Sequence, residues 1–86
     1  MTDKIPVTHR SVESYIISTG EYYKGYSNNT ITIYRNKKDE NLQVKIPLRQ
    51  EYDDYTYVLN EALVSLANIE NKSIDEMIEK ISKGWG

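Results

Sequence analysis

The sequence has no cysteine among its 86 residues, which excludes disulfides, thiolate chemistry and cysteine-based zinc sites. A chain of this length buries only about 60–65% of its unfolded surface, so its stability must come from packing or from a partner. The absence of cysteine is typical of a reducing compartment. No stretch resembles a signal peptide or approaches the roughly 18 apolar residues of a membrane span. We therefore expect a cytoplasmic protein that does not enter membranes.

Phenylalanine is also absent, whereas tyrosine occurs eight times. Most of the aromatic surface therefore carries a hydroxyl that needs a hydrogen-bond partner or water. The frequent use of Ile, Lys, Asn and Tyr indicates an AT-rich coding sequence, as found in low-GC bacteria and their phages.

Residues suited to catalysis are scarce. His9 is the only histidine and lies in a segment that we expect to be irregular. A serine nucleophile needs a base and an oxyanion hole, and no Gly-x-Ser-x-Gly motif is present. Four scattered glycines supply no phosphate-binding loop, and the paired carboxylates are better explained by helix dipoles than by a cation site. We expect no catalytic residues, no metal and no cofactor, and therefore not an enzyme.

The first half of the chain is predicted to form mainly strands. Residues 1–10 should be an extended lead-in, because Pro6 disfavours a helix there. Residues 12–19 are rich in β-branched side chains and predict a strand. Residues 21–29 contain Gly25 and two adjacent asparagines, which predict a loop or the irregular end of a hairpin.

In residues 30–35 and 42–48 an aliphatic side chain occupies every second position. This alternation predicts a β-hairpin around a charged turn at 36–41. The alternation predicts that the following side chains face the core: Ile31, Ile33, Leu42, Val44, Ile46 and Leu48. It predicts a polar, wettable opposite face formed by Thr30, Thr32, Tyr34, Gln43 and Lys45.

From Glu51 the apolar residues recur with the period of an amphipathic helix that extends to Ile69. Asp53 or Asp54 can serve as its N-cap, and the carboxylates complement the dipole of its first turn.

A second helix follows a break at residues 71–73. Asn71 tolerates the left-handed conformation of a turn, and Ser73 with Glu76 matches a capping box. The apolar stripe of this helix covers the core or, alternatively, a second subunit, and comprises Ile74, Met77, Ile78, Ile81 and Trp85.

These elements predict one α+β domain over residues 1–86, with a sheet in 11–50 and two helices in 51–86. The fold class is a small three-stranded antiparallel sheet, connected as a meander, followed by two C-terminal helices packed on one face.

Charge is divided unequally along the chain. Residues 1–50 carry a balance of +3 and residues 51–86 a balance of −5. The two halves can attract each other, or the acidic helices can meet a basic partner. The acidic residues in question are Glu51, Asp53, Asp54, Glu61 and Glu70.

The tyrosine-rich stretch combines rings with flexible polar residues, as protein-binding loops do. It contains Tyr22, Tyr23, Lys24 and Tyr26. Alternatively, these rings cap the small core with their hydroxyls at the surface, since no phenylalanine is present to do so. We expect a non-enzymatic macromolecule-binding protein, such as a phage or mobile-element inhibitor that docks onto a host nucleic-acid-handling protein.

Two alternatives stay open. The hairpin offers a basic and aromatic surface for single-stranded nucleic acid, although the acidic pI of about 5.3 argues against it. The residues that would form this surface are Tyr34, Arg35, Lys37, Lys38 and Lys45. The second alternative is a homodimeric structural module that associates through the last helix.

Overall fold

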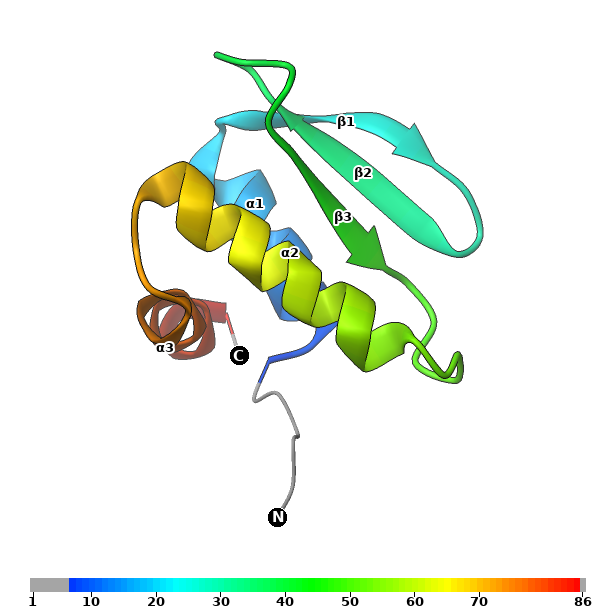
Figure 1. The fold of residues 1–86 in the computed structure, drawn as a ribbon. Helices are drawn as coiled ribbons and strands as arrows, with labels where there is room; N and C mark the ends of the chain where they lie inside the picture. Colours follow the sequence, from blue (N-terminus) through cyan, green and yellow to red (C-terminus); the bar gives the residue numbers. More distant parts are fainter. Residues whose placement is uncertain (1–6, 86) are drawn as a thin grey trace.

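The computed structural model describes residues 7–85 as six elements in the order α1-β1-β2-β3-α2-α3 (Figure 1). Their bounds are α1 His9–Thr19, β1 Tyr22–Ser27, β2 Ile31–Asn36, β3 Gln43–Pro47, α2 Tyr55–Glu70 and α3 Ile74–Trp85. The sheet is antiparallel in the order β1-β2-β3, so the α+β class, the meander and the two C-terminal helices are confirmed. Within residues 7–85, no helix is both long and apolar enough to cross a bilayer.

Helix α1 replaces the strand predicted over residues 12–19, and that prediction is wrong. A capping box starts the helix, in which the Ser11 N–H donates to Thr8 and the Thr8 N–H donates to Ser11 (2.9 Å). Gly20 ends it in the left-handed conformation, with φ +69°. Helical spacing also buries Val12, Tyr15 and Ile16 on one side. The predicted sheet region 11–50 therefore begins with a helix. That helix also includes His9 and Arg10, which were predicted to belong to the extended lead-in.

Strand β1 occupies most of residues 21–29, so of the two predictions for this segment the irregular hairpin is correct and the loop is wrong. A β-bulge between Lys24 and Tyr26 accommodates Gly25, where a Cβ atom would lie 2.7 Å from the Arg35 Nε. The turn to β2 is closed by Asn28, whose Oδ1 accepts hydrogen bonds from the backbone N–H groups of Thr30 (2.7 Å) and Ile31 (2.9 Å). Glycine and asparagine thus mark a bulge and a tight turn here.

The alternation of β2 is the reverse of the predicted one. Thr32 and Tyr34 are buried against the helices, whereas Ile31 and Ile33 face away from them. The prediction for β3 is confirmed for Val44 and for Ile46, which are fully buried, although Leu42 is 38% exposed. Directly paired residues of an antiparallel ladder share a face. Tyr34 pairs with Val44, and Thr32 pairs with Ile46.

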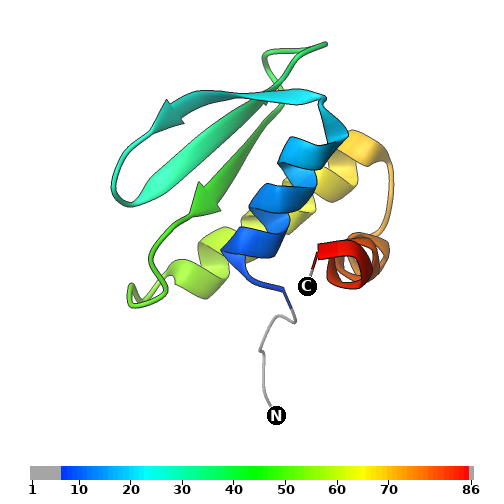
Figure 2. The same ribbon diagram turned by 180° about the vertical axis from the view of Figure 1, so that it is seen from behind.

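The helices form two layers beneath the sheet. Helices α1 and α2 contact the sheet, and α3 packs across both of them on the side away from it (Figures 1 and 2). The core between the layers includes Leu59, Leu63, Leu66, Met77 and Ile81, each at most 1% exposed. Met77 and Ile81, from the apolar stripe of α3, therefore belong to the core. The Trp85 side chain is outside the described part of the structure.

Helix α2 begins at Tyr55, so the expected position of three acidic residues in its first turn is wrong. Asp54 occupies the N-cap but makes no side-chain capping bond, and Glu51 and Asp53 precede the helix.

The predicted break between α2 and α3 is confirmed. Asn71 adopts φ 60°, and the Ser73 N–H donates to the Glu76 Oε1 (2.9 Å). The reciprocal bond runs from the Glu76 N–H to the Ser73 Oγ (3.1 Å), which confirms the capping box.

We expect Gly20→Ala to lower the free energy of unfolding by about 1 kcal/mol, because a Cβ atom disfavours the left-handed conformation. For a domain of this size that corresponds to a Tm lower by roughly 4–8 °C, measurable by circular dichroism. Ser14→Ala, at an exposed position of the same helix, is the control and should not lower Tm, because alanine is the better helix former there. An unchanged Tm in Gly20→Ala would contradict this account of the helix end.

Candidate interaction surface

One face of the sheet has no helix over it in the described part of the chain (Figure 1). The strand register places side chains from all three strands on this face in two rows. One row is Tyr23, Arg35 and Gln43, and the other is Tyr26, Ile33 and Lys45. Ile31 lies beside the second row on β2. We call these seven residues the open face.

The open face combines aromatic, aliphatic and cationic groups. Tyr23 is 38% exposed and Tyr26 is 52% exposed, which makes them the most accessible rings of the sheet. The Arg35 side chain extends across the space left by Gly25 and donates to the Glu40 C=O (3.4 Å). None of the seven residues is acidic, so the formal charge of the open face is positive.

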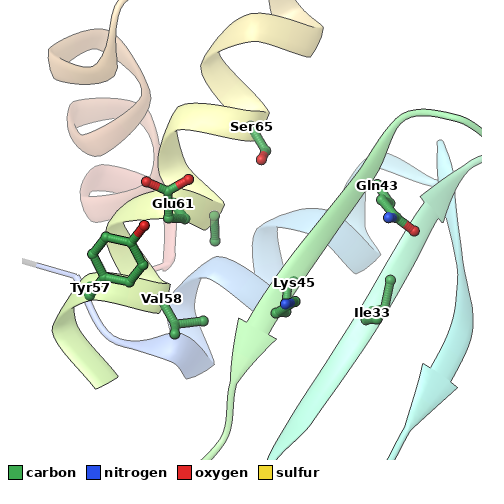
Figure 3. Close-up of a pocket in the computed structure, with 8 residues that line it drawn as sticks. Ile33, Gln43, Lys45, Tyr57, Val58, Glu61 and Ser65 are labelled. Atoms are coloured by element: carbon green, nitrogen blue, oxygen red, sulfur yellow. The ribbon is translucent and has the colours of Figure 1, made fainter. Parts of the chain in front are cut away.

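A groove of about 430 Å³ continues the open face at the edge of β3 (Figure 3). The sheet supplies one wall through Ile33, Gln43 and Lys45. Helix α2 supplies the other side, which is lined by Tyr57, Val58, Glu61, Ala62 and Ser65. The Tyr57 ring is 67% exposed and stands at the rim on the helix side. We call this the β3–α2 groove.

On the opposite side of the sheet, buried tyrosines bind carboxylates of the helices. Tyr34 is 4% exposed, and its hydroxyl donates to Glu13 of α1 (2.7 Å). The Tyr15 hydroxyl donates to Glu70 of α2 (2.6 Å). Burial first, and then the hydrogen bond to the carboxylate and its charge, raise the pKa of Tyr15 and of Tyr34 well above that of free tyrosine. The Tyr34 contact holds α1 against the sheet, and the Tyr15 contact joins α1 to α2.

A polar pocket of about 370 Å³ lies beside the second of these contacts. Its charged groups already neutralise one another. Lys80 lies 3.5 Å from Glu70 and 5.5 Å from the centre of the Tyr15 ring, and Lys38 lies 4.0 Å from Glu21. A ligand would have to disrupt these pairs, so we assign the pocket a structural role.

His9 connects the beginnings of α1 and α2. Its backbone N–H donates to the Tyr55 hydroxyl (3.1 Å), and its Nδ1 lies 2.9 Å from the same oxygen. Burial, reinforced by the charge of Arg10, lowers the pKa of His9. The imidazole therefore serves as a neutral hydrogen-bonding group that joins two helix ends.

The structure separates the acidic residues that were predicted to form one contact surface. Glu51, Asp53 and Asp54 are exposed in the turns before α2. Glu61 lies in the β3–α2 groove, and Glu70 is largely buried against Tyr15 at the other end of α2.

The predicted aromatic and basic sites are rearranged as well. Tyr34 faces the helices, so it cannot stack on a nucleic-acid base, and Tyr22 is part of the core. Lys37 and Lys38 lie in the turn between β2 and β3, and Lys24 is exposed on β1. The register instead brings four residues of the two predicted sites together on the open face: Tyr23, Tyr26, Arg35 and Lys45.

The sequence assigned no binding role to two residues of the open face and one of the β3–α2 groove. Ile31 and Ile33 were assigned to the core, and Tyr57 was given no role. Tyr57 does have a signal in the sequence, because the apolar positions of α2 at Val58, Leu59 and Ala62 leave it off the inner stripe.

The chain matches no protein-family model, no curated protein and no solved structure.

We expect the double variant Tyr15→Phe/Tyr34→Phe to be less stable at neutral pH by about 1–2 kcal/mol for each lost bond to a carboxylate. It should also be less sensitive to alkali. Unfolded tyrosine ionises near pH 10, whereas the folded protein keeps these two protons at higher pH. The stabilisation is therefore complete below about pH 10 and is lost as the pH rises further.

The difference in Tm between wild type and double variant, measured from about pH 8 to pH 11, tests this relation. It should shrink as the pH rises. Tyr52→Phe, at a ring that is 46% exposed, is the matched control and should follow the wild type. A constant difference across the range would contradict the assignment.

Proposed function

We propose that the protein is a non-enzymatic docking module that binds another protein through the open face. The observation that carries this proposal is the composition of that face. Two exposed tyrosines and two isoleucines lie on a sheet surface that no helix of the described chain covers and whose seven residues include no carboxylate. Such surfaces, apolar at the centre and polar at the rim, are typical of protein contacts.

The residue types support a protein partner. Tyrosine and arginine are enriched among the residues that dominate binding energy, and Tyr23, Tyr26 and Arg35 are neighbours here. Their backbone belongs to a sheet fixed by helices beneath it, so little conformational entropy is lost on binding.

The charge of the open face indicates the chemistry of the partner. Arg35 and Lys45 are its only charged residues, which favours a partner surface with acidic groups around an apolar centre. Binding should weaken as the ionic strength rises, because these cations are near the surface. The lack of cysteine supports our further proposal that the protein acts in the cytoplasm.

Single-stranded nucleic acid is a second candidate, favoured by two rings and two cations on one face. Three observations favour a protein instead. The chain is acidic overall, with a pI of about 5.3. The centre of the face is aliphatic, at Ile33. Finally, only two cations contribute, which limits the contacts available to phosphates.

The test begins with affinity capture from the source cell, followed by calorimetry with the purified partner. We expect Tyr23→Ser/Tyr26→Ser to weaken binding by at least about thirtyfold, the effect of losing roughly 2 kcal/mol at a hot spot. Tyr52→Ser removes a ring of similar exposure off the open face and should bind like the wild type.

Two results would contradict the proposal. One is unchanged affinity in the open-face variant together with loss of binding in Asp53→Asn/Asp54→Asn, which would assign the contact to the acidic turn before α2. The other is salt-sensitive, micromolar binding of a labelled single-stranded oligonucleotide that depends on Tyr23 and Tyr26, which would favour the nucleic-acid function.

A further inference from the structure

The outer edge of β3 has backbone groups that form no hydrogen bonds within the described residues. The Asn36 N–H donates to the Leu42 C=O (2.9 Å), and the Leu48 N–H donates to the Thr30 C=O (2.8 Å). In an antiparallel pair these bonded positions alternate with positions whose N–H and C=O point away from the neighbouring strand. The backbone groups of Gln43 and Lys45 therefore point outward, away from β2.

The outward groups of Gln43 and Lys45 lie next to the β3–α2 groove. The side chains of the same two residues form part of its wall (Figure 3). Across the groove, Tyr57 and Glu61 of α2 form the opposite rim, and Val58 contributes apolar surface. A strand edge and a helix flank thus border one cavity.

We propose that the β3–α2 groove binds an extended segment of a partner protein, which pairs with Gln43 and Lys45 as a fourth strand of the sheet. Unpaired backbone groups provide affinity in this mode, and the groove selects alternate side chains. This inference rests on the proposed function and deepens it, because Ile33, Gln43 and Lys45 belong to both surfaces.

The groove also indicates what the segment should carry. Lys45 on the strand wall and Glu61 on the helix wall form no ion pair among the described residues. A segment with an acidic side chain towards β3 and a basic one towards α2 complements both. An apolar or aromatic side chain between them fits Val58 and Tyr57. Pro47 has no N–H, so the pairing should span only a few residues at Gln43 and Lys45.

A second copy of this chain fits the groove less well. Pairing two β3 strands would place Lys45 of each copy on neighbouring strands of one face, where like charges repel. The other sheet edge, β1, contains a bulge and the exposed Lys24, both of which oppose strand addition.

The test uses a displayed library of random linear peptides, selected on the immobilised protein. We expect enriched peptides to alternate apolar and charged side chains and to bind at least about tenfold more weakly to Tyr57→Ala, which removes an exposed rim residue. Tyr52→Ala is the matched control and should bind them normally. Tm values of both variants should equal that of the wild type, because both rings are exposed.

Hydrogen exchange supplies a readout specific to strand pairing. A bound peptide should slow exchange of the Gln43 and Lys45 amides, and N-methylation of alternate peptide residues should abolish binding. Failure to enrich any peptide, or binding that leaves these amides unprotected, would overturn the proposal. So would a dimer in sedimentation that Tyr57→Ala dissociates, because the occupant would then be a second copy.

The two proposals fail separately. If Tyr23→Ser/Tyr26→Ser releases the captured partner while Tyr57→Ala retains it and no peptide is selected, the open-face function stands without the groove. If peptides bind in the groove but the open-face variant keeps its partner, the groove stands and the open face does not.

Discussion

The direction of the Tyr34 side chain determines which residues form the open face. Successive side chains of a strand point to opposite faces, so one fixed residue sets the phase of the whole strand. Tyr34 is buried, and its hydroxyl is held by Glu13 on α1. Ile33 and Arg35 must therefore lie on the open face, and their partners on β1 and β3 follow from the register.

The lack of phenylalanine explains why a hydrogen bond determines the direction of the Tyr34 side chain. Every large aromatic ring in the described core brings a hydroxyl, and a buried hydroxyl needs a partner. Tyr34 reaches α1, Tyr15 reaches Glu70 of α2, and no buried side-chain polar atom of the described residues lacks a partner. The same bonds that satisfy the hydroxyls thus attach α1 to the sheet and α2 to α1. Because α1 and α2 both pack on one side, no helix between residues 7 and 85 covers the other face.

The sequence revealed the elements whose signals are local. The alternation in β3, the period of α2 and the Ser73–Glu76 capping box all depend on residues close together in the chain. Helix α1 was missed because β-branched residues suggested a strand. Its capping box at Thr8 and the glycine at its end decided otherwise.

The phase of β2 was missed for a different reason. Hydropathy places Ile31 and Ile33 inside and Tyr34 outside, whereas the observed arrangement satisfies the Tyr34 hydroxyl with a carboxylate 21 residues away in sequence. The sequence therefore divided four candidate residues between two sites. It placed Tyr23 and Tyr26 in a protein-binding loop, and Arg35 and Lys45 on a nucleic-acid-binding hairpin. Their common surface emerges only from tertiary structure.

The bulge at Gly25 is what unites the two tyrosines. Residues three apart in a regular strand point to opposite faces. The extra residue between Lys24 and Tyr26 shifts the register by one, so Tyr23 and Tyr26 both point to the open face. Because Gly25 has no side chain, the Arg35 side chain can lie over the backbone between Tyr23 and Tyr26. A side chain at position 25 would have to displace that arginine. The feature that opposes strand addition at β1 therefore also assembles the aromatic half of the open face, and strand pairing is left to the edge of β3.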